Sequence, residues 1–166
     1  MLFRGFNTRF QSDFCWKFFT KPVNGGAFHH LLGAICMNII NVLIVVDTVE
    51  ALSSETLQDN VYLADNNHYL GSWGQGTNTL HTVVQNGQQI NWAVAAIAPS
   101  NEVIITGFTG AMITDKICIP KKSGLAQATI WSGTVQTQGD ISPWGYTITL
   151  MIDAKPMSFN SLIKVL

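Results

Sequence analysis

Five residues near the middle of the chain combine aromatic rings with amide, carboxylate and imidazole groups. They are Asp65, Asn67, His68, Tyr69 and Trp73. Sugar-binding sites use this chemistry, because a ring face stacks on the apolar side of a sugar while polar atoms bond its hydroxyls. Aromatic core filling beside a polar loop would place the same residue types together without any ligand. We therefore take the five as candidate ligand-binding residues, with carbohydrate as the partner they would suit.

Metal binding is not expected. Asp65 with Asn66 and Asn67 could offer oxygen atoms to a calcium ion, but a solvated turn built by the Asp65 side chain explains the same residues. The other carboxylates occur singly and without EF-hand spacing, and the chain has no CxxC pair or His-x3-His pair for zinc. The sequence predicts neither a metal nor a cofactor.

Catalytic patterns are also lacking. Only His68 and His81 follow Met37, and no serine or cysteine stands in a G-x-S-x-G turn. We expect His81 to be a cross-strand neighbour of Trp92 and not a general base. The glycines of segment 71–76 resemble a phosphate loop but lack its lysine and following helix, which favours a flexible or bulged connection. The sequence predicts no catalytic residue and no enzyme activity.

Charge divides the chain at Met37. Residues 1–36 carry four basic residues and one acidic residue (4 − 1 = +3), whereas the remaining 130 residues carry five and nine (5 − 9 = −4). We expect 1–36 to be a non-native or disordered extension, Met37 to be the true start, and 37–166 to be a single domain. Five lysines in that domain make no basic stripe, so nucleic acid is not an expected partner.

The segment 28–46 is apolar but does not suit a membrane span. Asn38 and Asn41 interrupt it and Asp47 ends it, so it is shorter than the ~20 apolar residues that a spanning helix needs. A signal peptide cleaved near Ala51 is the alternative, at the cost of a good strand. With Cys118 as the one cysteine after Met37, the reducing cytoplasm is the simplest location.

Short runs of β-branched and alternating residues, separated by turn residues, predict an all-β domain. About seven or eight strands are expected, packed as a two-sheet antiparallel β-sandwich, with a closed β-barrel as the alternative. The candidate segments are 39–46, 61–64, 69–70, 79–85, 88–97, 102–108, 126–136, 146–153 and 157–165.

Three local predictions depend on single patterns. The run 39–46 is continuously apolar, which is typical of a strand buried on both sides. Segment 48–59 is the one stretch that could form a short helix, with Ser53 or Ser54 as its cap. Asn86-Gly87 predicts a two-residue type I′ hairpin that sets Val83 opposite Ile90.

Longer strings of sequence carry a family resemblance. The segment from LQDNVYLADNNHYLGSWGQG to GFTGAMI, with MNIINVLIVVDTVEAL before it and LMIDAKPMSF after it, closely resembles the bacterial inclusion body protein family typified by PixA and AidA. The resemblance covers 37–166. It implies a small cytoplasmic β protein that accumulates in inclusions, often under quorum or growth-phase control in host-associated bacteria, with no known reaction.

Three functional hypotheses follow. The first is a non-enzymatic, self-associating inclusion-type protein, favoured by the low charge of 11% and by the resemblance. The second is a lectin-like, carbohydrate-binding sandwich, and the third, least favoured, is an enzyme. Exposed edge strands or apolar surface would mediate the self-association.

Overall fold

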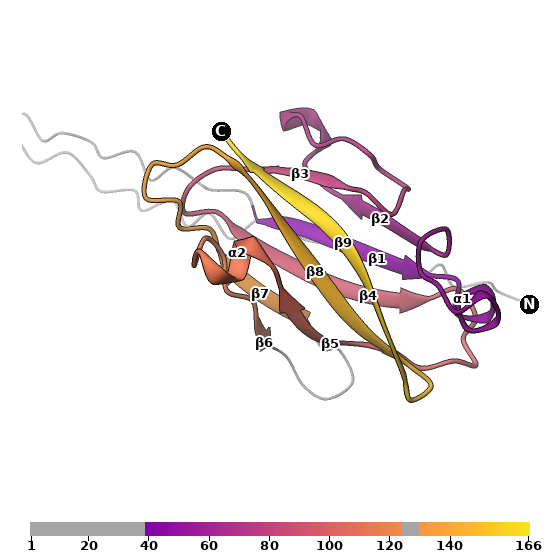
Figure 1. Cartoon of the computed structure of the whole chain (residues 1–166). Coiled ribbons are helices and arrows are strands. Elements are labelled where there is room, and N and C mark those ends of the chain that lie inside the picture. Colours follow the sequence, from indigo (N-terminus) through magenta and orange to yellow (C-terminus); the bar gives the residue numbers. More distant parts are fainter. Residues whose placement is uncertain (1–38, 124–129) are drawn as a thin grey trace, which may run out of the picture. The chain divides into compact units, whose positions relative to one another are not determined.

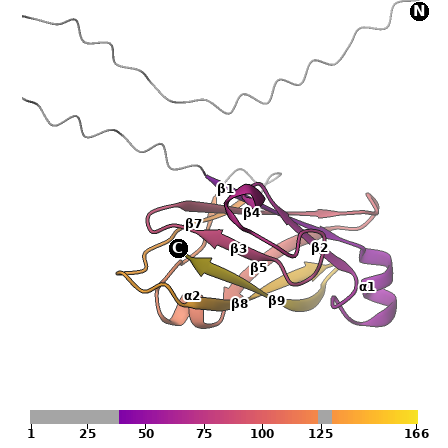
Figure 2. The same cartoon turned by 90° about the horizontal axis from the view of Figure 1, so that it is seen from above.

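The structure is a computed structural model that describes residues 39–123 and 130–166. These residues form two β-sheets that pack face to face (Figures 1 and 2). The five-stranded sheet has the order β2 (Val61–Asp65), β1 (Ile40–Val46), β4 (Gln89–Ala96), β7 (Ile130–Thr134) and β6 (Lys121–Ser123). The four-stranded sheet has the order β3 (His81–Val84), β9 (Lys155–Val165), β8 (Pro143–Ile152) and β5 (Val103–Thr109). The predicted two-sheet sandwich is confirmed.

The sheets are mixed and not purely antiparallel. β1 pairs with β4 in parallel, and β3 pairs with β9 in parallel, while the other pairings are antiparallel. The described residues contain nine strands instead of seven or eight, two short helices, α1 (Thr48–Ser54) and α2 (Ala111–Thr114), and one 3-10 turn, η1 (His68–Leu70). Segment 69–70, predicted as a strand, lies in η1. The expected strand 126–136 is described only from Ile130 onward.

Apolar and polar residues alternate along the strands, so one face of each sheet packs against the core. In β8, Tyr146, Ile148, Leu150 and Ile152 are buried while the residues between them face outward, as predicted. β1 alternates as well: Ile40, Val42, Ile44 and Val46 are buried, but Leu43 is 44% exposed. The prediction that this strand is buried on both sides was wrong, because a second apolar face does not by itself bring a covering layer.

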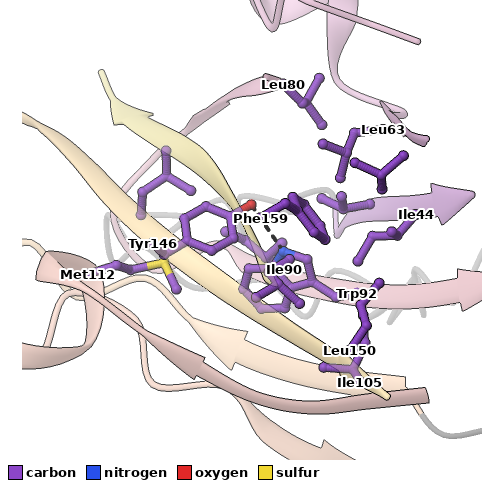
Figure 3. Close-up of a cluster of buried hydrophobic side chains, with 14 of the residues drawn as sticks. Ile44, Leu63, Leu80, Ile90, Trp92, Ile105, Met112, Tyr146, Leu150 and Phe159 are labelled. Atoms are coloured by element: carbon purple, nitrogen blue, oxygen red, sulfur yellow. Dashed lines mark hydrogen bonds between the residues drawn. The ribbon is translucent and has the colours of Figure 1, made fainter. Parts of the chain in front are cut away.

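Trp92 joins the two sheets at the centre of the core. It is fully buried on β4, and its Nε1 donates a hydrogen bond to the hydroxyl of Tyr146 on β8 at 3.3 Å (Figure 3). The Phe108 ring packs against both of these side chains. Burial raises the pKa of the Tyr146 phenol, so the hydroxyl stays protonated and can accept from the indole.

The Asn86-Gly87 turn connects the two sheets instead of forming a hairpin. Gln88 N–H donates to the Gln85 carbonyl at 3.1 Å, so the chain does reverse there. Only Gly87 of the two central residues has a positive φ, of 86°, which is the pattern of a type II turn. Such turns splay their flanking strands, whereas type I′ turns keep them paired. The prediction that Val83 pairs with Ile90 was therefore wrong, since β3 pairs with β9 and β4 pairs with β1 and β7.

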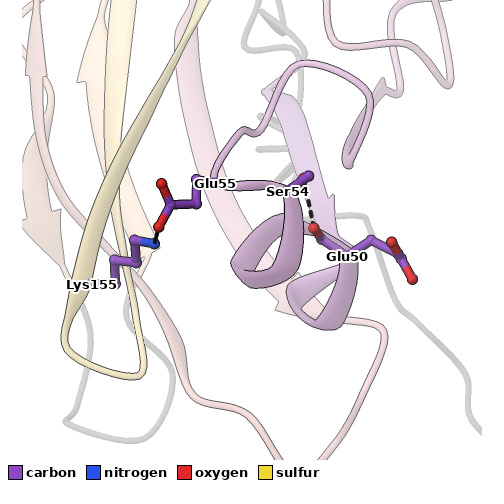
Figure 4. Close-up of polar contacts among 4 residues, drawn as sticks. All are labelled: Glu50, Ser54, Glu55 and Lys155. Carbon is purple, nitrogen blue, oxygen red and sulfur yellow. Dashed lines mark hydrogen bonds and ion pairs between the residues drawn. The ribbon is translucent and has the colours of Figure 1, made fainter.

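Helix α1 begins at a different cap from the predicted Ser53 or Ser54. Asp47 is the N-cap, and its Oδ1 accepts from Glu50 N–H at 3.2 Å. Ser54 donates instead to the Glu50 carbonyl near the end of the helix (Figure 4). The next residue, Glu55, forms an ion pair with Lys155 on β9 at 2.7 Å, on an exposed surface where such pairs stabilise little.

Candidate functional site

The polar members of the predicted ligand set make bonds inside the protein. Asp65 Oδ1 accepts from Asn67 N–H at 2.9 Å and from Gln75 Nε2 at 2.8 Å, which makes the turn expected of an Asp side chain. The buried Asn67 side chain donates to the Val83 carbonyl on β3. These bonds hold the segment that follows β2 against the edge of the four-stranded sheet.

The aromatic members lie on this same segment. The rings of His68 and Tyr69 are 3.8 Å apart at their centroids, and Tyr69 is 87% exposed. Trp73 forms a β-bridge with His81, and their rings stack at 4.4 Å with 19° between their planes. Lys164 Nζ lies 5.8 Å from the Trp73 ring centroid. His81 thus packs against Trp73 and not against Trp92, because β3 and β4 belong to different sheets.

A groove lies beside His81 on the outer face of the four-stranded sheet. Its base follows one row of paired residues across three strands: His81 on β3, Leu162 on β9 and Gly145 on β8. Because Gly145 has no side chain, the sheet surface is hollow there. The hollow has a volume of about 400 Å³ and is lined by Thr79, Leu80, His81, Gly110, Gly145, Tyr146, Thr147, Asn160, Ser161 and Leu162.

The neighbouring row of the sheet supplies polar groups to the groove. Thr147 Oγ1 donates to Asn160 Oδ1 at 2.7 Å between β8 and β9. This bond leaves the amide nitrogen of Asn160 directed away from it as a further donor. A second hollow of about 320 Å³ shares Thr79 and Asn160 with the first and is lined otherwise by Thr56, Gln58, Asn78, Ser158 and Phe159. We call the two adjoining hollows together the outer groove.

Neutral chemistry dominates the outer groove. Among the described residues that line it, none is Asp, Glu, Lys or Arg. Its rim carries hydroxyl and amide groups, and its base is glycine and leucine. Such a lining can hold an uncharged ligand with both polar and apolar surface.

The outer face of the five-stranded sheet differs in character. Asn41, Asn91 and Ser132 form a hydrogen-bonded row across β1, β4 and β7, with bonds of 3.1 and 2.8 Å. Beside this row, six outward-facing residues form what we call the apolar patch: Leu43, Val45, Tyr62, Ala64, Ala93 and Ala95. The described outward-facing residues of β1, β2 and β4 include no charged side chain.

One further hollow, of about 450 Å³, lies at the β7 and β6 end of this sheet. Among its described lining residues, Lys116 and Lys121 are charged and the remainder are mostly polar. Its described lining contains no aromatic residue, whereas His81, Tyr146 and Phe159 line the outer groove. None of the five predicted ligand-binding residues is among the described lining residues of these hollows. The aromatic residues and neutral rim make the outer groove the better candidate site.

Among the described residues, the edge strands β2 and β3 are covered by the chain itself, and the edge strand β5 is bulged. The free edge of β2 forms hydrogen bonds with the following segment, at Gln75, Gly76 and Thr77. The free edge of β3 forms hydrogen bonds with Asn67, Ser72 and Trp73. On β5, the Ile105 carbonyl accepts from Trp131 Nε1 at 3.2 Å, and the pairing with β8 is interrupted after Ile105. Strands covered or bulged in this way are poor templates for pairing with another chain.

Several catalytic or metal-binding arrangements are not formed by the part of the chain that the structure describes. Within residues 39–123 and 130–166, no three His, Cys, Asp or Glu side chains come together to hold a metal ion. The groove that His81 lines contains no carboxylate. Cys118 is buried as a free thiol. No described helix is long and apolar enough to cross a membrane.

Comparison with known proteins identifies the family. The model of the domain of unknown function DUF8788 matches residues 38–158. The chain belongs to this family. A search of curated proteins gives no match.

The fold of this DUF8788 member is similar to that of a solved structure. The crystal structure of an inclusion body protein (PixA) from Burkholderia cenocepacia J2315 superposes with a TM-score of 0.61 at 10% sequence identity, covering 77% of this chain and 95% of that chain. At this identity the likeness concerns the fold, and it agrees with the resemblance seen in the sequence strings.

Sequence reasoning missed most of the groove. His81 was expected only as a neighbour of Trp92. Thr147, Asn160 and Leu162 fell within predicted strands without a role in a site, and Gly145 lay just outside the predicted strand 146–153. The pairing of β8 with β9 could have been inferred from the short connection between these two strands. The parallel pairing of β3 with β9, which brings His81 beside Leu162, has no local signal.

Proposed function

We propose that this protein is a non-enzymatic, inclusion-body-type protein of the bacterial cytoplasm whose copies associate through the apolar patch. The observation that carries the proposal is this uncharged patch on the outer face of the five-stranded sheet. Leu43 and Tyr62 are 44% and 40% exposed within it. Contiguous apolar surface of this kind on a soluble protein commonly marks an interaction site.

A second copy of the chain is the partner that suits the patch. Three alanines and Val45 surround the two large side chains of the patch, Leu43 and Tyr62. Two copies that meet through the same face bring no like charges together, since the outward residues of β1, β2 and β4 are uncharged. Lateral strand pairing is a weaker route, because β2, β3 and β5 have covered or bulged edges.

Two observations support the non-enzymatic part of the proposal. His81 lines a groove without a carboxylate that could orient it as a general base. The fold neighbour is described as an inclusion body protein. Both observations favour a protein that accumulates and associates with its own copies over an enzyme.

The test compares two lysine substitutions in the full chain. Leu43→Lys places a charge in the apolar patch, and Ile104→Lys places one on β5 of the other sheet, where Ile104 is exposed to a similar degree, 39%. Light scattering coupled to size exclusion is measured over a range of protein concentrations. We expect the native chain and Ile104→Lys to grow in mass with concentration, and Leu43→Lys to remain a monomer.

The proposal fails if the native chain stays monomeric at the highest concentration. It also fails if Leu43→Lys, with an unchanged circular dichroism spectrum, associates as strongly as Ile104→Lys. The second result would show association through another surface.

A further inference from the structure

We propose that the outer groove binds a neutral saccharide. The inference is independent of self-association, which uses the opposite sheet. It differs from a site built on Asp65 and Asn67, whose polar atoms bond within the protein. The ligand instead lies over β8 and β9, with His81 as one wall; the Trp73 ring stacks on His81 but does not line the groove.

The first argument is the combination of an apolar base with a polar rim. Leu162 and Gly145 offer an uncharged surface to the C–H face of a sugar ring, and Thr147, Asn160 and Thr79 stand around it with hydroxyl and amide groups. Sugars present the same combination, since each ring has C–H faces and an equatorial belt of hydroxyls. Each hydroxyl can both donate and accept, and so can the threonine and asparagine side chains of the rim.

The second argument is charge. The described lining residues of both hollows include no Asp, Glu, Lys or Arg, so the groove offers no permanently charged partner to a buried carboxylate, phosphate or ammonium group. His81 is the one basic side chain among them. An acidic sugar or a nucleotide would lose hydration without gaining a lysine or arginine partner. The groove therefore selects an uncharged ligand.

The third argument is extent. The two hollows adjoin at Thr79 and Asn160, and the second continues past Ser158 to Asn78 and Gln58. Its lining is again hydroxyl and amide in character. A groove that continues in the same chemistry suits an oligosaccharide of more than one unit better than a single small molecule.

The wall at His81 is rigid enough to position a ligand. Backbone bonds in both directions join His81 to Trp73, at 2.9 and 3.2 Å, and the two rings stack. Lys164 lies over the Trp73 ring and not in the groove lining. Preformed walls lower the ordering cost of binding.

The test fills the groove without disturbing the fold. A Cβ atom at Gly145 would meet only Leu162 Cδ2, at 3.8 Å, an ordinary contact, and the backbone there is not left-handed. Gly145→Val therefore starts from an unstrained Cβ position and extends its methyl groups from the base of the groove. Gly107→Val is the matched control: Gly107 is a strand glycine of the same sheet, with nothing within 4 Å of its Cβ position and no part in the groove. The full chain and both variants are applied to an array of neutral and sialylated oligosaccharides, with calcium and with chelator.

We expect binding to neutral oligosaccharides, unchanged by chelator. Gly145→Val should weaken binding to the strongest neutral oligosaccharide, measured by titration calorimetry, by about tenfold or more, because added methyl groups exclude the sugar ring. Gly107→Val should bind as the native chain does. A second pair, Thr147→Val and Thr106→Val, tests the rim, since Thr147 lines the groove and Thr106 on β5 does not. The Thr147 change alone should weaken binding.

The inference is overturned if no neutral oligosaccharide binds, or if only sialylated ones do. It is equally overturned if Gly145→Val and Gly107→Val, both folded by circular dichroism, bind alike. None of these outcomes changes the light-scattering result for Leu43→Lys, so the two proposals fail separately.

Discussion

At the scale of single residues, Cys118 shows how burial removes chemistry that composition suggests. A Cβ atom added at Gly133 on β7 would lie 2.5 Å from the Cys118 Sγ. The thiol therefore packs directly against the backbone of this strand. Burial raises the pKa of this thiol from 9.0 to about 12. A thiol in this state is a small apolar side chain and not a nucleophile.

We predict that Cys118 does not react in the folded protein at pH 8. The raised pKa reduces the thiolate fraction by about a thousandfold, and burial excludes the reagent as well. The measurement is the rate of modification by a chromogenic disulfide reagent in a Cys15→Ser/Cys36→Ser variant, which leaves Cys118 as the sole thiol. Denaturant serves as the control and should restore the rate of a free thiol. Fast modification without denaturant would contradict the prediction.

At the scale of elements, periodicity within one strand was readable from the sequence and pairing between strands was not. The alternation in β8 predicted its buried face correctly, because the period of two is a local property. Asn86-Gly87 predicted a chain reversal correctly but assigned the wrong partners. Val83 and Ile90 are both buried. Two buried apolar residues can pair within one sheet or face each other from two sheets, so residue type alone does not distinguish these arrangements.

The same limit applies to the candidate site. Trp73 was predicted as a ligand-binding residue from its chemistry, whereas His81 was expected only as a neighbour of Trp92. The groove residues Gly145 and Asn160 are brought beside His81 by the parallel pairing of β3 with β9. In the first sheet, parallel pairing of β1 with β4 joins residues about fifty positions apart, and nothing in either strand specifies its partner. Long-range contacts of this kind are fixed by the packing of the whole core and not by local preference.

One turn does keep the geometry of a tight hairpin. The β8–β9 connection consists of Asp153 and Ala154, with φ of 44° and 70°, and Ile152 pairs directly with Lys155. Positive φ at both positions is the type I′ pattern that matches strand twist. Asp153 also accepts from the Asn101 side chain and from Glu102 N–H, and these bonds lower the pKa of its carboxyl. Ala154 has no such compensation for its left-handed backbone.

We predict that Ala154→Gly stabilises the protein. Left-handed backbone costs an alanine about 1 kcal/mol relative to glycine, so the free energy of unfolding should rise by about that amount. Chemical denaturation followed by circular dichroism measures the change. Ala64→Gly in β2 is the control, because Ala64 is an exposed strand residue with ordinary backbone, and this change should lower the free energy of unfolding. Destabilisation by both substitutions would contradict a strained turn at 154.

At the scale of the whole domain, the two sheets divide the surface into faces of different chemistry. The apolar patch lies on the outer face of the five-stranded sheet, and the outer groove lies on the outer face of the four-stranded sheet. In a sandwich these faces point in opposite directions (Figure 2). Association through the patch therefore leaves both grooves of a pair accessible, on opposite sides of the assembly.

This arrangement predicts cross-linking, a prediction that rests on both proposals. Because the two grooves of a pair face opposite ways, one pair can hold two saccharide-coated particles together. The native chain and Ile104→Lys should therefore aggregate beads densely coated with the bound oligosaccharide. Leu43→Lys should bind the soluble oligosaccharide with the affinity of the native chain but should not aggregate the beads. Turbidity of the bead suspension measures aggregation, and titration calorimetry measures the affinity. Equal bead aggregation by Leu43→Lys and Ile104→Lys would show that association through the apolar patch does not present the two grooves together.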